Sequence, residues 1–139
     1  MALTTFSGPV RSLNGFITGH QPTAANAINA TGTATAAQVA DGYITSTSAL
    51  ATTITLPTGT ALGAALGASQ GTSLDLYIDN TAGANTVTIA VNTNAILSSA
   101  AADTAGSFGD LTVAAGATGL ARYTIMFSSA TAYVFTRTA

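Results

Sequence analysis

Apolar and polar residues alternate with a period of two along much of this chain, and this pattern limits its possible folds more than any other feature. Residues 73–79, Ser-Leu-Asp-Leu-Tyr-Ile-Asp, place leucine and isoleucine on one side and aspartate and tyrosine on the other. Such alternation is typical of a half-buried strand. The same pattern occurs at residues 86–91, 122–127 and 132–137. Shorter candidate strands lie at residues 36–40, 42–46, 51–56 and 111–114.

Turn-forming residues join several of these strands and indicate how they pair. The segment 80–85, Asn-Thr-Ala-Gly-Ala-Asn, carries the asparagine and glycine of a hairpin loop, so we expect the strands on either side of it to pair antiparallel. Residues 128–131 predict a second hairpin at the end of the chain. About eight strands at this spacing predict an all-β fold, an antiparallel β-sandwich of jelly-roll-like type. Only residues 60–68 are expected to form a helical turn.

The alternation also assigns the aromatic side chains to faces. Tyr123 and Tyr133 share the inner stripes of their strands with Phe127 and Phe135, so we expect all four in the core. Tyr77 faces away from the apolar side of its strand and is a candidate for a contact surface.

The first 32 residues follow neither a helical nor a strand period. We therefore divide the chain into an N-terminal arm and spacer, residues 1–32, and a β-sandwich domain, residues 33–139. An arm with large apolar side chains and no core of its own must dock, either on its own sandwich or on a partner; an ordinary N-terminal strand with a loop is the simpler alternative. The candidate contact residues of the arm are Phe6, Val10, Arg11, Leu13, Phe16 and Ile17.

Charged side chains are unusually scarce. The 139 residues include three Arg and five Asp but neither Lys nor Glu, which gives a net charge of -2. A soluble domain that works alone normally has about a quarter of its residues charged. We therefore expect much of this surface to lie against copies of the same chain or against a larger partner.

The composition also excludes several classes of function. Without a basic stripe, nucleic acid and anionic membrane surfaces are not expected partners. The first twenty residues lack the continuous apolar stretch of a signal peptide, and the most apolar region, residues 49–68, is interrupted by glycine and proline, unlike a membrane span. Cysteine is absent, so no disulfide or thiolate metal site is available.

Catalytic chemistry finds little support in the sequence. The single histidine, His20, lies in the arm with no neighbouring carboxylate, so we expect a polar arm contact there and not a general base. The glycines at 63, 67 and 71 lack the lysine of a phosphate-binding loop. We predict that the protein is not an enzyme, with no catalytic residues and no cofactor.

Asp75, Asp79 and Asn80 offer oxygen ligands of the kind that Ca²⁺ accepts. Two carboxylates and one amide are a small ligand set. A solvated strand face, or a bond from Arg122 to one of the two aspartates, is the favoured reading, so no metal site is predicted.

Three segments carry a resemblance to a known family: TTFSGPVRSLNGF, ITLPTGTALGAALGASQGTSLDLYIDNTAGANTVTIAVN and LARYTIMFSSATAYVFTRTA. Together they resemble small decoration, or cement, proteins of tailed-bacteriophage capsids. The resemblance implies a β-sandwich of jelly-roll or related type that assembles as a homotrimer. It also implies that this trimer lies on the outer surface of the virion and clamps neighbouring major capsid proteins.

Two other functions remain open. A trimeric phage fibre or receptor-binding head domain, which would bind carbohydrate or another cell-surface ligand, would also have a neutral β-rich surface, but we find no shaft repeats. An ice-binding protein would use aligned threonines, and several Thr-x-Thr motifs are present, among them those at 33–35, 53–55, 58–60, 86–88 and 136–138. No constant interval joins them, which weakens that interpretation.

Overall fold

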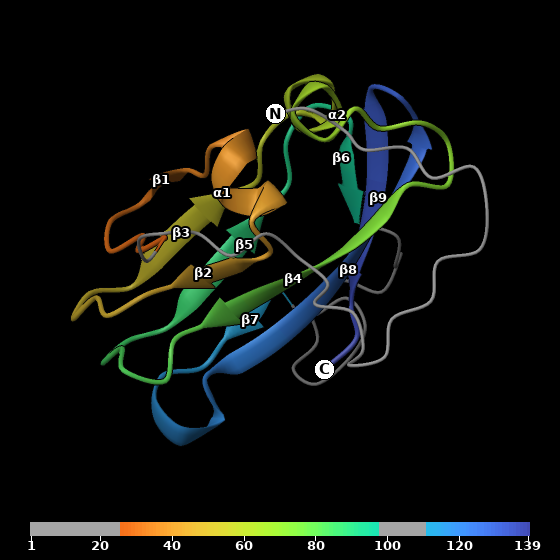
Figure 1. The fold of residues 1–139 in the computed structure, drawn as a ribbon. Helices are drawn as coiled ribbons and strands as arrows, with labels where there is room; N and C mark the ends of the chain where they lie inside the picture. Colours follow the sequence, from red (N-terminus) through yellow and green to blue (C-terminus); the bar gives the residue numbers. More distant parts are fainter. Residues whose placement is uncertain (1–25, 98–110) are drawn as a thin grey trace, which may run out of the picture.

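The computed structural model describes residues 26–97 and 111–139 (Figure 1). Within these residues the chain forms nine strands, two α-helices and one 3-10 helix. In chain order they are β1 (Gly32–Thr33), α1 (Ala36–Ala40), β2 (Tyr43–Thr45), β3 (Thr52–Thr55), α2 (Gly59–Leu66), β4 (Ser73–Asp79), β5 (Val87–Ala90), β6 (Ala95–Leu97), β7 (Thr112–Val113), η1 (Gly116–Thr118), β8 (Leu120–Ser129) and β9 (Ala132–Arg137).

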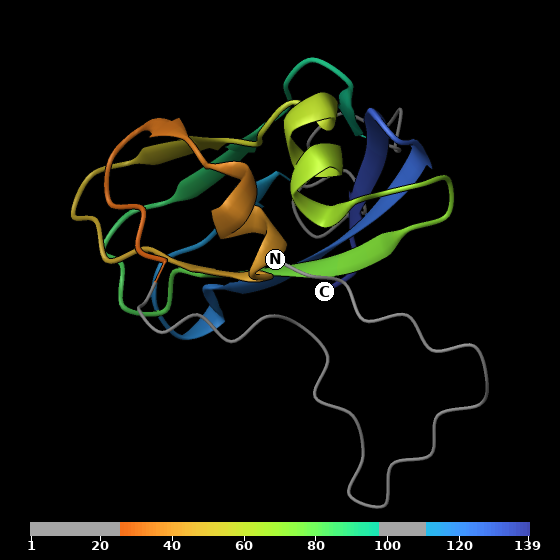
Figure 2. The same cartoon turned by 45° about the horizontal axis from the view of Figure 1, so that its top comes forward.

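The strands form two mixed sheets, so the expectation of a β-rich fold is confirmed. The four-stranded sheet has the order β1-β3-β5-β7, and the five-stranded sheet has the order β2-β4-β8-β9-β6. Figure 2 shows the two sheets one above the other, with α1 and α2 at one open side of the space between them. One apolar cluster from both sheets fills that space. Its fully buried large side chains are Ile44, Ile54, Leu56, Leu62, Leu76, Ile78, Ile89, Tyr123, Ile125, Phe127, Tyr133 and Phe135.

The expectation of an antiparallel jelly-roll arrangement is wrong. The pairs β1–β3, β3–β5, β2–β4 and β6–β9 are parallel, and only β4–β8, β5–β7 and β8–β9 are antiparallel. From β1 to β8, successive strands alternate between the two sheets. Because the chain crosses to the other sheet and back before it adds the next strand, neighbouring strands such as β3 and β5 run in the same direction.

The hairpin predicted around residues 80–85 is also wrong. β4 belongs to the five-stranded sheet and β5 to the four-stranded sheet, so this loop connects the two layers. Asn80 fixes the crossing point: its side chain is buried, and its Nδ2 donates to the backbone carbonyls of Asn85, Val113 and Ala114 at 2.9, 3.3 and 3.0 Å. A six-residue loop can span the roughly 10 Å between packed sheets as readily as it can close a hairpin.

Residues 36–40, predicted as a strand, form the short helix α1 instead. Thr35 caps the helix by accepting a hydrogen bond from the Gln38 backbone N–H, and the Gln38 side chain accepts one from the Thr35 backbone N–H. This reciprocal capping box, together with the helix propensity of Ala-Ala-Gln-Val-Ala, outweighs a weak alternation over five residues.

The helical turn predicted for residues 60–68 is confirmed as α2. Thr58 caps its first turn, and Gly67 ends it in the left-handed conformation with φ of 60°. The glycines inside the helix have a packing role. Gly59 and Gly63 lie directly against the turn between β8 and β9, which leaves no room for a side chain at either position.

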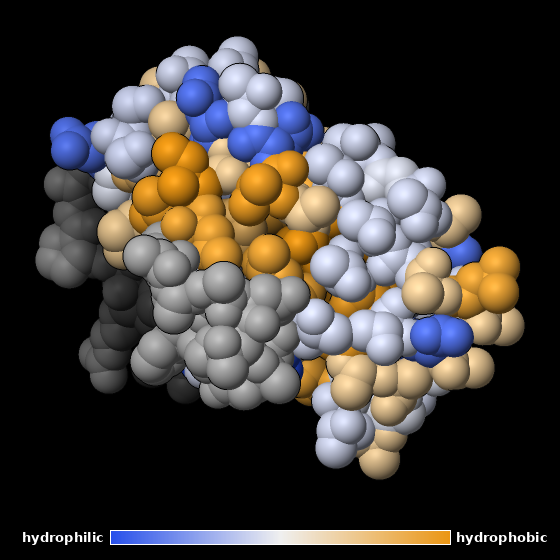
Figure 3. Space-filling model, turned by 180° about the vertical axis from the view of Figure 1, so that it is seen from behind, coloured by the Kyte–Doolittle hydropathy of each residue, from blue (hydrophilic) through white to orange (hydrophobic). Residues whose placement is uncertain are grey.

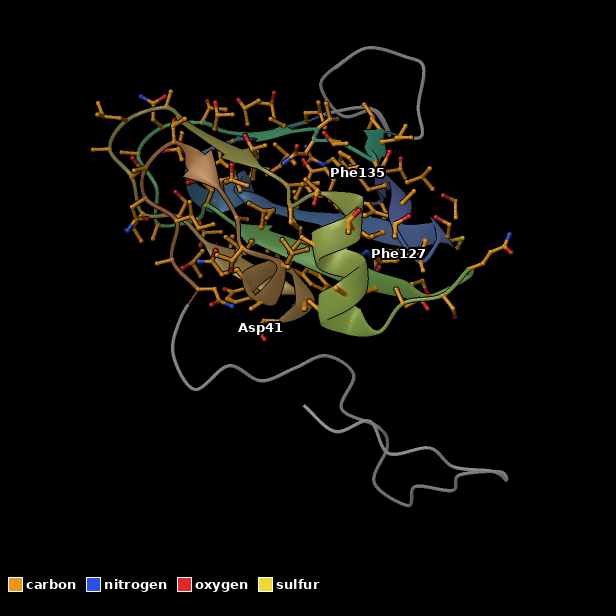
Figure 4. All side chains as sticks on the ribbon, turned by 90° about the horizontal axis from the view of Figure 1, so that it is seen from above. Asp41, Phe127 and Phe135 are labelled. Atoms are coloured by element: carbon orange, nitrogen blue, oxygen red, sulfur yellow. The ribbon has the colours of Figure 1, made fainter. Side chains whose placement is uncertain are left out.

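The C-terminal hairpin and its aromatic core are confirmed. β8 and β9 pair antiparallel with Phe127 opposite Tyr133 and Ile125 opposite Phe135. The Phe127 and Tyr133 ring centroids are 5.4 Å apart, and the Tyr123 and Phe135 rings meet edge to face at 6.3 Å. Such pairs add to the free energy of burial. Phe127 and Phe135 are labelled in Figure 4, on the strands beside α2.

Candidate functional site

The six arm residues predicted to contact a partner, and His20, lie outside the described residues. The proposed division at residue 32 falls within β1, and the residues just before it pair with the folded part. Ile28 N–H donates to the Thr45 carbonyl at 2.9 Å, and Thr45 N–H donates to the Asn26 carbonyl at 3.0 Å. The candidate surfaces must therefore be sought on the two outward sheet faces.

The outer face of the five-stranded sheet gathers most of the large apolar side chains that remain exposed. We call it the aromatic face. Strand register places two of its residues side by side, Tyr43 on β2 and Tyr77 on β4, which are 40% and 37% exposed. The residues that define this face are Tyr43, Tyr77, Leu120, Met126, Val134 and Ile96.

The apolar residues of the aromatic face form two groups with a polar row between them. Leu120 lies opposite Asp79 beside the two tyrosines, whereas Met126 and Val134 pair at the other end. The row between is Asp75, Thr124 and Thr136, in register across β4, β8 and β9. Thr124 Oγ1 donates to Asp75 Oδ1 at 2.7 Å.

Asp79 is the most constrained acid on this face. The Tyr43 hydroxyl donates to Asp79 Oδ2, and the Thr81 backbone and hydroxyl both donate to Oδ1, at 2.9 and 2.6 Å. The bonds from Thr81 and then from Tyr43 hold the pKa of the Asp79 carboxyl below its ordinary value. The same bond, with a smaller contribution from burial, raises the pKa of the Tyr43 hydroxyl.

The candidate calcium ligands do not converge. Asp75 and Asp79 both face outward from β4, but Asn80 is fully buried and its amide nitrogen donates between the sheets. Arg122, considered as a partner for these aspartates, donates from Nε to the Thr138 hydroxyl at 3.0 Å. In residues 26–97 and 111–139, no group of three or more histidine or acidic side chains is placed to hold a metal ion.

The outer face of the four-stranded sheet is covered by threonine. We call it the threonine face, defined by Thr33, Thr53, Thr55, Thr88 and Thr112. Thr53, Thr88 and Thr112 form one row across three strands, while Ile54, Val87 and Val113 between them point into the core. Figure 3, which views the molecule from this side, shows an area of near-neutral hydropathy with a strongly apolar area beside it.

These rows show why the spacing of threonines along the sequence did not reveal which threonines lie side by side in the sheet. The Thr-x-Thr motifs have no constant interval, but pairing of β3 with β5 still brings Thr53 beside Thr88. None of the residues that define this face carries a charge. The face can therefore form close contacts through hydroxyls and methyls without removing an ion from water.

The sequence indicated Tyr77 as an exposed contact residue and missed Tyr43. The alternation did indicate that Tyr43 points outward. Ile44 is the apolar residue of the strand predicted at 42–46, so its neighbours must point the other way. Tyr123 and Tyr133 are buried as expected, and burial raises the pKa of the Tyr133 hydroxyl.

In the part of the chain that the structure describes, neither α-helix has the length and apolarity needed to cross a membrane. Comparisons of the sequence and the structure with protein-family models, with curated proteins and with solved structures found no match.

Proposed function

We propose that this protein is a structural component of a virion, a capsid decoration or cement protein of a tailed bacteriophage. In this proposal it binds as a homotrimer to the outer surface of the phage head and clamps neighbouring major capsid proteins. It catalyses no reaction and uses no cofactor, and neither nucleic acid nor a membrane is among its partners.

The single observation that carries the proposal is that both outward sheet faces are suited to protein contact. The threonine face offers uncharged side chains in rows, and the aromatic face offers apolar side chains such as Leu120 and Met126 that are about half exposed. A protein that works alone would place lysine or glutamate at such positions. Burying the threonine face costs little in desolvation, and burying the apolar groups of the aromatic face removes apolar surface from water.

The arm supplies a second kind of contact in this proposal. Phe6, Val10, Leu13, Phe16 and Ile17 provide apolar side chains for a groove on the capsid protein, and Arg11 provides the arm's one formal charge. A charge-assisted hydrogen bond from Arg11 to an acidic group of the capsid protein would contribute about 1.5–3 kcal/mol where it is shielded from water.

Trimeric assembly would turn weak contacts into lasting attachment. Three linked protomers around a local symmetry axis raise the effective concentration of each contact after the first. A protein that binds the assembled shell but not its separated subunits stabilises the shell by mass action.

Binding to bare heads of the phage that carries this chain tests the proposal. We expect the full chain to bind and to raise the temperature at which the heads release their genome, and deletion of residues 2–20 to weaken binding strongly. Replacement of Phe6 and Phe16 by serine should weaken it in the same direction, whereas the matched control, Thr4→Ala with Thr18→Ala in the same arm, should not. An unchanged release temperature on saturated heads would contradict a cement function.

A receptor-binding head domain is the second candidate, favoured by the two adjacent tyrosines. Tyr43 and Tyr77 present neighbouring aromatic rings beside Asp79 and Arg122, a combination that can stack on a sugar ring and hydrogen-bond to its hydroxyls. Binding to a glycan panel that is lost in Tyr77→Ala and retained in Met126→Ala would support this function over the cement function.

A further inference from the structure

The apolar and polar side chains of the aromatic face are arranged in a pattern that bears on the protein when no phage head is present. Its two apolar groups, one around Tyr43, Tyr77 and Leu120 and the other around Met126 and Val134, are separated by the polar row that contains Asp75. Five of its side chains are between 37% and 54% exposed. Apolar exposure of this extent on one face indicates a covering segment or partner.

The described part of the chain begins at the edge of this same face. Ala27 pairs in parallel with Thr45 on β2, so the chain arrives beside the outer edge of the five-stranded sheet. Because residues 26–28 run in the direction of β2, their N-terminal end is toward Tyr43. Asn26 is further held by a 2.8 Å hydrogen bond from its Nδ2 to Asp41. The first described residue, Asn26, therefore lies next to the first apolar group.

The sequence of residues 1–25 has the complementary pattern. Leu13, Phe16 and Ile17 precede Asn26, then comes Arg11 toward the N-terminus, and then Val10 and Phe6. Two apolar groups thus flank one positive charge, and on the face two groups flank the row that contains Asp75, with Arg122 opposite Tyr77 and Asp79 opposite Leu120 within the first of them.

The length of the segment is sufficient to cross the face. An extended chain spans about 3.3 Å per residue, so the ten residues from Phe6 to Phe16 reach about 33 Å. The five strands of the sheet lie about 4.8 Å apart, which makes the face about 20 Å wide.

We propose that, in the unbound protein, residues 1–25 lie across the aromatic face of their own chain, with Arg11 beside Asp75. Leu13, Phe16 and Ile17 then cover the Tyr43 and Tyr77 group, and Phe6 and Val10 cover the group around Met126. Covalent attachment at Asn26 gives the same chain's segment an effective concentration that a separate copy does not have. The proposal goes beyond the cement function, because it concerns the protein before any shell is present.

The four tyrosines allow a direct test on the full chain. Tetranitromethane nitrates accessible tyrosine rings, and mass spectrometry measures the rate at each position. Tyr77 is the reporter, while Tyr123 and Tyr133 are buried and serve as an internal control for folding. We expect slow nitration of Tyr77 in the native protein and faster nitration after Phe6→Ser with Phe16→Ser, with the two buried tyrosines unreactive in both proteins.

The matched control is Thr4→Ala with Thr18→Ala, which should leave Tyr77 as slow as in the native protein. Equal rates at Tyr77 in the native and Phe-to-Ser proteins, with Tyr123 still unreactive, would overturn the proposal. Because the experiment contains no phage heads, a negative result would overturn docking of the arm and would leave the proposed cement function untouched.

Charge reversal tests the pairing of Arg11 with Asp75. Arg11→Asp or Asp75→Arg alone should raise the Tyr77 nitration rate by up to about fivefold. Loss of an exposed ion pair changes the ratio of covered to uncovered Tyr77 by up to about that factor. Both substitutions together should restore the slow rate. Single substitutions that leave the rate unchanged would rule out this pairing. Mixing light and isotope-labelled chains before crosslinking should yield crosslinks within one chain, and crosslinks mainly between chains would contradict docking on the same chain.

Discussion

Gly63 in α2 lies so close to the turn between β8 and β9 that a Cβ atom on it would come within 1.9 Å of the Ala130 carbonyl oxygen. This contact joins the helix to the C-terminal hairpin that carries most of the aromatic core. Gly59, one turn earlier, meets the same turn, where its Cβ would lie 2.3 Å from the Thr131 carbonyl oxygen. The two glycines lower the intrinsic helix propensity but allow the backbones to pack directly.

Replacement of Gly63 by alanine should therefore destabilise the protein. Helix propensity alone would give a gain of about 1 kcal/mol, but the clash with the Ala130 backbone should cost more than that gain, because overpacking of a tight site costs about 1–3 kcal/mol. Urea unfolding of Gly63→Ala checks this. Gly32→Ala is the matched control, since its Cβ would meet only the Ala30 carbonyl oxygen at 4.0 Å. A Gly63→Ala protein more stable than the native chain would contradict the packing role.

Asn80 should be the most sensitive polar residue of the described fold. Replacement by alanine removes the donor shared by the carbonyls of Asn85, Val113 and Ala114 and leaves them buried or partly buried without it. We expect a loss of about 2–4 kcal/mol in the free energy of unfolding, measured by chemical denaturation. Asn85→Ala, in the same loop and exposed, should cost less than about 1 kcal/mol. Equal losses from the two variants would show that Asn80 does not hold the layers together.

The Tyr43 and Asp79 contact should make stability depend on pH at both ends of the scale. Because the Asp79 pKa is lowered in the folded state, its contribution is present above the unfolded value of about 3.9 and is lost as the pH falls through the lower folded value. The Tyr43 pKa is raised, so its contribution is present below about 10 and is lost as the pH rises through the higher folded value.

The contribution of Asp79 is measured by the free energy of unfolding of the native protein and of Asp79→Asn between neutral and acidic pH. The native protein should be the more stable at pH 7, and the difference should shrink as the pH falls through the lowered pKa of Asp79. Tyr43→Phe removes only one of the three bonds to Asp79 and should show a smaller loss at pH 7. A difference between native and Asp79→Asn that persists unchanged in acid would show that the carboxylate is not the stabilising form.

A charge on the threonine face should block assembly without unfolding the protein. Thr88 lies between Thr53 and Thr112, in the middle strand of a three-strand row, so Thr88→Lys places an ammonium group where we propose that a neutral neighbour packs. Binding to bare heads should weaken by at least about tenfold, because the ion must be desolvated. Ala84→Lys, in the exposed loop between β4 and β5, is the matched control and should bind normally. Unchanged binding of Thr88→Lys would exclude this face from the contact.

The alternation in the sequence predicted where most strands lie and which side of each is buried. Two apolar residues that are two positions apart, such as Leu76 and Ile78 or Tyr133 and Phe135, identify the buried side of their strand. It could not predict which strand is the neighbour. A polar loop of six residues fits a hairpin and an interlayer connection equally well, and only the burial of Asn80 decides between them. The direction of pairing follows from such choices, and the crossing from β4 to β5 is one of several that place parallel neighbours in both sheets.

Short elements escaped prediction for a different reason. β1 and β6 have two and three residues, too few for a pattern, and β6 depends on its parallel pairing with β9. α1 was missed although Thr35 and Gln38 carry its capping signal. The two candidate surfaces could be foreseen in part, with Tyr77 outward, but the rows that unite Thr53 with Thr88 or Tyr43 with Tyr77 exist only through strand register.

The mass of the unbound protein in solution, measured by light scattering after size-exclusion chromatography, shows whether this chain assembles with its own copies. If the uncharged threonine face of this chain serves contacts with its own copies, the particle should have a mass of about three times the 13.6 kDa of one chain. A stable monomer at 13.6 kDa, unchanged at high protein concentration, would contradict self-assembly as the reason for the scarcity of charge.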